Sequence, residues 1–173
     1  MVKLKWKREG LFLILAALII TADQITKLCI RTSLAAGESL PPFGPLTIIH
    51  IQNTGSAFGL FGNQTMILSA IALAGLIAMI CFYPYISRIA SWGGFCLSLI
   101  FAGAAGNLID RIARGNVTDF IYIRLWEDVY WPAFNVADSS ITIGTIILIT
   151  SVMITMQKEN EGGSNDGNKD LSD

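Results

Sequence analysis

Four long apolar stretches constrain the fold of this chain more than any other feature of its sequence. They run from about Leu11 to Ile30, Met66 to Phe82, Ser91 to Ile109 and Asn135 to Met156. A helix needs roughly 17–25 residues to cross a hydrocarbon core about 30 Å thick. Only 14% of the 173 residues are charged, against about 25% in an ordinary soluble domain. The sequence therefore predicts an α-helical integral membrane protein with four transmembrane helices.

The first stretch has a second interpretation, as a cleavable signal peptide. Basic residues precede an apolar run that ends in the small-residue pair "TA", as in secretory signal peptides. The segment continues beyond that pair as "DQITKLCI", however, and three further apolar stretches follow. We therefore interpret it as an uncleaved first helix.

The distribution of basic residues predicts the orientation in the membrane. Lys3, Lys5, Lys7 and Arg8 crowd the N-terminus, whereas residues 32–64 contain no Lys or Arg. Because cytoplasmic segments carry the excess of basic residues, the N-terminus is expected in the cytoplasm. An even number of spans returns the C-terminus to the same side. The connection near residues 112–134 then lies outside.

These expectations divide the chain into three parts. Residues 1–10 form a basic cytoplasmic N-terminus, and residues 11–156 form the membrane domain. Residues 157–173 are polar, rich in Gly and aperiodic, which predicts a disordered cytoplasmic tail.

The two outer connections contain strand-like sequence. Leu46–Gln52 and Phe120–Trp126 are rich in β-branched and aromatic residues. We expect a small extracytoplasmic β-rich element of a few short strands. Aromatic residues of the second connection fit a belt at the membrane interface: Trp126, Tyr130, Trp131 and Phe134.

Composition argues against several classes of partner and cofactor. A net charge of -1 offers no basic face for nucleic acid. The three cysteines are widely spaced in apolar segments, and His50 is the single histidine of the sequence. Zinc sites need several such ligands in close spacing. The sequence therefore predicts no metal site of this kind and no disulfide framework.

Polar residues within or beside the spans are candidates for function, because charge is costly next to hydrocarbon. Asp23 and Lys27 are four residues apart on one helical face. They form either an ion pair that helps the helices assemble or a contact to substrate. Asn107, Asp110 and Arg111 share another face. Arg111 either pairs with a carboxylate such as Asp110, contacts a backbone carbonyl or lipid headgroup, or anchors the helix at the interface.

Asp119 and Asp138 lie where the third and fourth stretches approach each other on the outer side. Each has a structural interpretation, Asp119 as a turn residue and Asp138 as an anion near a helix N-terminus. If the two face each other, they share one proton and activate water, as in aspartic proteases. Asn53 is either a turn residue or an amide offered to an extended peptide. Asn135 is placed to orient a carboxylate or bind substrate backbone.

Five motifs occur in this order: "DQITK" at 23–27, "NTGSAFG" at 53–59, "GNLIDR" at 106–111, "VTDF" at 117–120 and "PAFNVADSSI" at 132–141. With four spans, this pattern closely resembles the bacterial lipoprotein signal peptidases, also called signal peptidase II. The resemblance covers about residues 10–156. Each motif alone is weak, but five in sequence are highly specific.

The resemblance implies an intramembrane aspartic endopeptidase of the bacterial inner membrane. Members of this family remove the signal peptide from diacylglyceryl-modified prolipoproteins, cutting just before the lipidated cysteine. By resemblance, Asp119 and Asp138 are catalytic and act near the outer leaflet. Other matching positions are substrate-binding (Asn53, Asn107, Arg111, Asn135) or supporting (Asp23, Lys27, Asp110). The implied partners are the lipid-modified signal peptide and membrane lipids, and the enzyme is expected to act as a monomer without a cofactor.

Two rival functions use the same residues differently. A small ion- or proton-coupled transporter would use Asp23, Lys27, Asp119 and Asp138 as a relay. The lack of an evident inverted repeat in the sequence disfavours it. A serine protease would need Ser56 with His50, or Ser139 with Lys27, and Asp23 already competes for that lysine.

Overall fold

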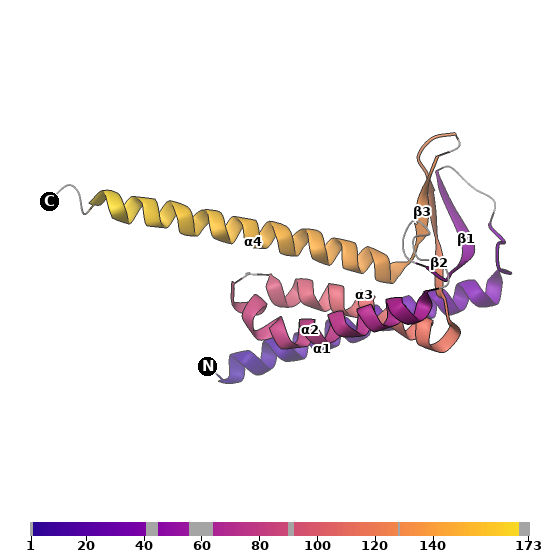
Figure 1. Ribbon diagram of the computed structural model, residues 1–173, viewed down its shortest axis with the longest axis horizontal. Coiled ribbons are helices and arrows are strands. Elements are labelled where there is room, and N and C mark those ends of the chain that lie inside the picture. Colours follow the sequence, from indigo (N-terminus) through magenta and orange to yellow (C-terminus); the bar gives the residue numbers. More distant parts are fainter. Residues whose placement is uncertain (1, 41–44, 56–63, 90–91, 128, 170–173) are drawn as a thin grey trace.

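The computed structural model describes residues 2–40, 45–55, 64–89, 92–127 and 129–169. These form four helices and one three-stranded sheet (Figure 1). The helices are α1 (Val2–Ser33), α2 (Thr65–Ile89), α3 (Gly93–Arg114) and α4 (Val136–Lys169), and the strands are β1 (Leu46–Asn53), β2 (Val117–Arg124) and β3 (Tyr130–Phe134). In each helix a segment is long and apolar enough to cross a membrane: Gly10–Ser33, Thr65–Ile89, Gly93–Arg114 and Val136–Gln157. The predicted fold class is confirmed.

Helix α3 is the centre of the bundle, because α1, α2 and α4 all pack against it. It is the most buried of the four spans. Its contact with α4 is close: a Cβ atom added to Gly103 would overlap the carbonyl oxygen of Ala137, and one added to Gly144 would lie 2.8 Å from Leu99. Small residues allow such close approach of helices in lipid, where packing replaces the hydrophobic effect between helices.

The sheet lies at one end of the bundle, and the N-terminus of α1 lies at the other (Figure 1). Its order is β1-β2-β3, with antiparallel neighbours. Ile51 of β1 pairs with Asp119 of β2, and Ile121 pairs with Phe134 of β3. Strand β2 starts three residues before the predicted Phe120, so Asp119 belongs to the strand and not to a preceding turn. Strand β3 is not predicted as a strand, since its aromatic residues suggest only an interfacial belt.

Two helices extend beyond their predicted ends. The sequence predicts that the second span stops at Tyr83-Pro84, but α2 contains Pro84 and continues to Ile89. Proline removes only one backbone donor and is tolerated in membrane helices. Helix α4 continues to Lys169, past residue 157 where the sequence predicts a disordered tail to begin. The Gln-Lys-Glu stretch at that junction consists of good helix formers.

Candidate active site

Asp119 is placed by a tight turn between α3 and β2. Gly115 follows the last residue of α3 with φ of 75°, and its N–H donates to the carbonyl of Arg111. A left-handed residue of this kind ends helices, and glycine adopts it without strain. The chain therefore reverses at once into β2, whose first four residues are buried. Only 3% of the Asp119 surface is exposed.

Asp138 is placed by the first turn of α4. The N–H of Asp138 donates to Asn135 Oδ1 at 2.9 Å, and the N–H of Asn135 donates back to Asp138 Oδ2 at 3.2 Å. This reciprocal arrangement is a capping box, in which two otherwise unpaired donors at a helix start are satisfied. The predicted place of Asp138 near the start of the fourth helix is confirmed.

Three side-chain amides hold the two carboxylates. Asn53 Nδ2 and Asn135 Nδ2 donate to the two oxygens of Asp119, at 2.9 and 2.7 Å. Asn107 Nδ2 donates to Asp138 Oδ1 at 2.7 Å. Asn135 thus contacts both aspartates, one through its side chain and the other through the capping box. The structure brings together residues from β1, α3, β2 and the start of α4 that are far apart in sequence.

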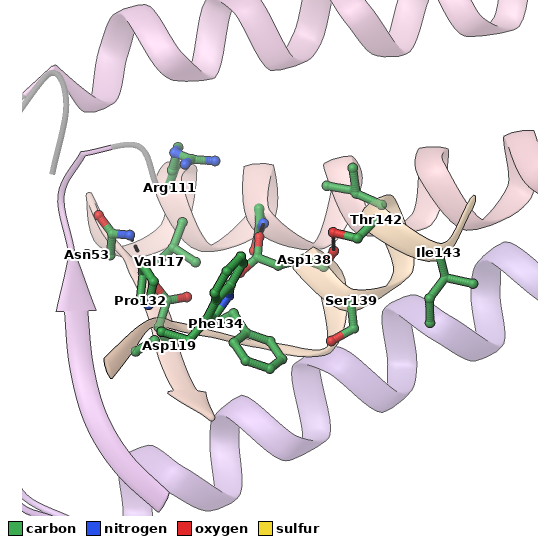
Figure 2. A pocket seen from close by; sticks show the side chains of 14 residues that line it. Asn53, Arg111, Val117, Asp119, Pro132, Phe134, Asp138, Ser139, Thr142 and Ile143 are labelled. Atoms are coloured by element: carbon green, nitrogen blue, oxygen red, sulfur yellow. Dashed lines mark hydrogen bonds between the residues drawn. The ribbon is translucent and has the colours of Figure 1, made fainter. Parts of the chain in front are cut away.

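Both aspartates line a pocket of about 540 Å³ (Figure 2). Arg111 reaches it from α3, and its Nη2 lies 3.5 Å from the carbonyl oxygen of Gly55, which is one of the alternatives that the sequence left open for this residue. The remaining wall is mostly apolar. It is formed by Val117, Trp131, Pro132, Ala133, Phe134, Ser139, Ile141, Thr142 and Ile143, with Asn53 and Asn107 beside the carboxylates. A pair of acids in an apolar pocket is suited to proton transfer, because the pocket disfavours two simultaneous charges.

Burial raises the pKa of Asp119 to about 7, and the negative charge of Asp138 acts in the same direction. Hydrogen bonds from Asn53 and Asn135 oppose this shift, since they stabilise the charged form. A carboxyl group with such a pKa holds a proton near neutral pH and can donate it.

We expect the stability of the protein to fall as the pH rises towards 8. An unfolded aspartate loses its proton near pH 3.8, whereas Asp119 in the folded protein keeps it until about pH 7. Its stabilising contribution is therefore fully present below the unfolded pKa and is lost as the pH rises through the folded pKa. Thermal unfolding in detergent at several pH values measures this dependence. The dependence should become less steep between about pH 5 and 7 in Asp119→Asn, and an unchanged slope would contradict the shift.

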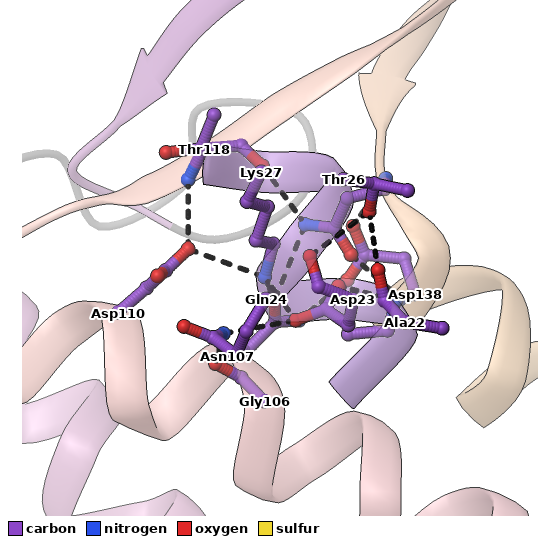
Figure 3. Close-up of polar contacts among 12 residues, drawn as sticks. Ala22, Asp23, Gln24, Thr26, Lys27, Gly106, Asn107, Asp110, Thr118 and Asp138 are labelled. Atoms are coloured by element: carbon purple, nitrogen blue, oxygen red, sulfur yellow. Dashed lines mark hydrogen bonds and ion pairs between the residues drawn. The ribbon is translucent and has the colours of Figure 1, made fainter. Parts of the chain in front are cut away.

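A buried cluster of charged side chains lies close to Asp138 (Figure 3). Lys27 Nζ lies 2.9 Å from Asp23 and 3.2 Å from Asp110, and all three side chains are 0% exposed. The predicted ion pair of Asp23 and Lys27 is therefore present, and Asp110 extends it to α3. Arg31 and Arg114 approach the other oxygen of Asp110, at 3.6 and 3.4 Å.

The cluster also contacts the backbone that carries the aspartates. Asp23 Oδ1 accepts the N–H of Ala137 at 3.0 Å, in the first turn of α4. Asp110 Oδ2 accepts the N–H of Thr118 at 3.2 Å, next to Asp119. The buried charges of α1 and α3 therefore fix the backbone next to Asp138 and next to Asp119.

Some site residues were missed at the sequence level. Trp131 and Phe134, assigned there to an interfacial belt, line the pocket together with Pro132. Their position in sequence, within four residues of Asn135, was a signal that could have identified them. His50 is on β1 as expected but is buried, with Nδ1 2.9 Å from the carbonyl oxygen of Leu34. Ser56, considered above as a nucleophile, lies outside the described residues.

The fold and pocket define a multi-pass membrane protein with a polar site at one end of its helical bundle. A family model described as signal peptidase (SPase) II matches residues 15–154. A lipoprotein signal peptidase of Moorella thermoacetica is 38% identical over 83% of this chain and 93% of its own length. That of Thermodesulfovibrio yellowstonii is 42% identical over 76% of this chain and 87% of its own.

Solved structures agree with this assignment. A bacterial membrane enzyme determined by the in meso method at 2.3 Å resolution has a TM-score of 0.75 and 32% identity, covering 86% of this chain and 91% of that one. A second, at 1.9 Å resolution, has a TM-score of 0.69 and 33% identity, covering 83% and 92%. The chain belongs to the signal peptidase II family and is therefore a peptidase of bacterial membranes. The resemblance inferred from the five motifs is confirmed.

Proposed function

We propose that this protein is an aspartic endopeptidase that removes the signal peptide from diacylglyceryl-modified prolipoproteins, cutting just before the lipidated cysteine. Asp119 and Asp138 form its catalytic pair. The observation that carries the proposal is the placement of both carboxylates in one pocket, where Asn135 contacts each of them. Membership of the signal peptidase II family favours this function over the transporter.

The mechanism follows from two acids that share one proton. The ionised carboxylate accepts a proton from water, whose oxygen attacks the scissile carbonyl carbon. The protonated carboxyl group donates to the carbonyl oxygen, which gives a tetrahedral diol. As the diol collapses, the first carboxyl group passes its proton to the leaving amine, and the second takes a proton back from a diol hydroxyl group. Each general acid or base contribution is typically worth about 10²–10⁴-fold in rate. No step needs a metal ion or organic cofactor.

Substrate contacts come from the polar rim and the apolar wall. Arg111 and the amides of Asn53 and Asn107 line the pocket and supply groups that can bind a peptide backbone, while Trp131 and other apolar residues suit side chains or lipid. Asn135, expected to bind substrate, is fully buried and contributes by holding Asp119. Asp23, Lys27 and Asp110 have a supporting role. One chain carries every residue that the mechanism uses, which supports activity as a monomer.

The arrangement of the bundle suits cleavage near the outer leaflet. The basic N-terminus is expected in the cytoplasm, and the sheet lies at the opposite end of the bundle (Figure 1). Asp119 is in strand β2 of that sheet, and Asp138 is in the first turn of α4, which follows β3. A signal peptide also enters with its basic end inside, so its cleavage site reaches the outer side. The acyl chains of the modified cysteine stay in the bilayer and hold the scissile bond beside the pocket.

The test compares a diacylglyceryl-modified prolipoprotein with the same prolipoprotein lacking the lipid. We expect the purified protein to convert the modified substrate to a smaller product in a gel assay and to leave the unmodified one intact. Mass spectrometry of the product locates the cut. Equal cleavage of both substrates would contradict the lipid requirement. No cleavage of either, by protein shown to be folded, would contradict the function.

A further inference from the structure

Asn107 is the one side chain that contacts both Asp138 and the buried ion cluster through its amide, among the residues that the structure describes. Its Nδ2 donates to Asp138 Oδ1 at 2.7 Å, and its Oδ1 accepts from Lys27 Nζ at 2.9 Å (Figure 3). Asn135 Nδ2 donates to the same oxygen at 3.2 Å. The amide therefore has donors on one side and a carboxylate on the other.

The orientation of such an amide depends entirely on its partners, because its oxygen and nitrogen are nearly equal in size. Turned over, Asn107 would point its NH₂ group at an ammonium and its oxygen at a carboxylate. An ammonium has three donors and no acceptor, so it can face only the oxygen. Lys27, the charged and shorter of the two donors to Asn107 Oδ1, thus favours with Asn135 the orientation in which the NH₂ group faces Asp138.

The Lys27 ammonium group is held in place, so its hydrogen bond to the amide of Asn107 persists. Its side chain is 0% exposed, and its three N–H donors match three acceptors on Asp23, Asp110 and Asn107. A Cβ atom at Gly106 would lie 2.7 Å from Asp23 Oδ2, so the glycine leaves space for Asp23 against α3. The ammonium is therefore held in one position by contacts from two helices.

We propose that Lys27 is a positioning residue, which acts through the amide of Asn107 to hold Asp138 ready to accept the proton of water. The inference rests on the proposed function, because it assigns Asp138 the part of the base in the catalytic pair. Lys27 itself does not line the pocket. Its loss should therefore slow the chemical step and leave substrate binding nearly unchanged.

The test uses two variants and one control. Lys27→Met leaves Asp23 and Asp110 buried beside an uncharged side chain, so it is paired with Asp23→Asn/Lys27→Met, which removes one charge of each sign. An asparagine at position 23 still offers an oxygen to the N–H of Ala137. The control is Arg114→Met, which removes a 36% exposed cation of the same cluster that contacts Asp110. Folding of each variant is checked by thermal unfolding in detergent.

For the folded double variant we expect kcat to fall by about 10- to 100-fold, a cost typical of losing a partner that orients a reacting group. KM should change little. The acidic limb of the kcat/KM profile should move to higher pH, because the amide of Asn107 is no longer held with its NH₂ group towards Asp138, whereas the lost charges of Lys27 and Asp23 offset each other. Arg114→Met should show neither change.

A merely structural role for Lys27 would lower the unfolding temperature and leave kcat per folded enzyme and the acidic limb unchanged. That result in the double variant would overturn the proposal. It would leave the proposed function intact, because the function fails only if the unsubstituted protein does not cleave the lipid-modified substrate or if the aspartates are dispensable.

Discussion

Replacement of Asp119 or Asp138 by asparagine is expected to abolish cleavage, with kcat falling by roughly 10⁴-fold in either variant. Asparagine has nearly the same shape as aspartate, so the shape of the pocket is kept. One of the two hydrogen bonds that each aspartate accepts must change, because an NH₂ group cannot accept from another donor. It can neither accept the proton of water nor donate one to the carbonyl oxygen. The measurement is single-turnover cleavage of a lipid-modified prolipoprotein by purified enzyme in detergent.

The matched control is Glu127→Gln, the same kind of change at an exposed carboxylate next to β2. It should leave kcat within about twofold of the unsubstituted enzyme, as a surface substitution away from the pocket. Membrane insertion should be retained in all three variants. Full turnover by either asparagine variant would show that the acid–base pair lies elsewhere.

Gly103→Ala is expected to impair both stability and activity. The added methyl group would overlap the backbone carbonyl of Ala137, one residue before Asp138, and would also meet Ile141. Because neither α3 nor the first turn of α4 can yield locally, the two helices must separate. Overpacking of this kind costs about 1–3 kcal/mol. A shift of Asp138 by about 1 Å can lower the rate by roughly 10²-fold.

Gly75→Ala provides the control for this substitution. Gly75 is also within a membrane helix, but a Cβ atom there meets nothing within 4 Å. Alanine is the better helix former by up to about 1 kcal/mol, so this variant should be as stable as the unsubstituted protein or more so. Thermal unfolding and cleavage are measured for both variants. Equal unfolding temperatures and cleavage rates in the two variants would show that close packing of α3 against α4 is not needed for stability or activity.

The spans could be predicted from the sequence, because their signal is local and strong. Uncharged apolar runs of membrane length occur in few other contexts, and each predicted span overlaps a helix of the structure. Strand β1 was also predicted nearly to its bounds. Strand β3 was not, since Pro132 lies within a five-residue segment whose pairing depends on β2.

The candidate site was predicted as a set of residues but not as an arrangement. The motifs identify Asp119, Asp138 and the amide-bearing positions, and the spacing of Asp23 and Lys27 predicts their ion pair. No sequence pattern indicates that Asn135 contacts both carboxylates, or that Asn107 joins Lys27 to Asp138. These contacts join residues up to 80 positions apart.

Sequence alone thus determined that the chain crosses the membrane four times and which side chains are available for chemistry, because both depend on the chain's own composition and order. Tertiary structure decided which carboxylate faces which amide and where α4 begins relative to α3. The physical reason is that these contacts require separate helices to approach each other closely. Small residues such as Gly103 leave the space for that approach, and buried charges such as Lys27 must find their partners across it.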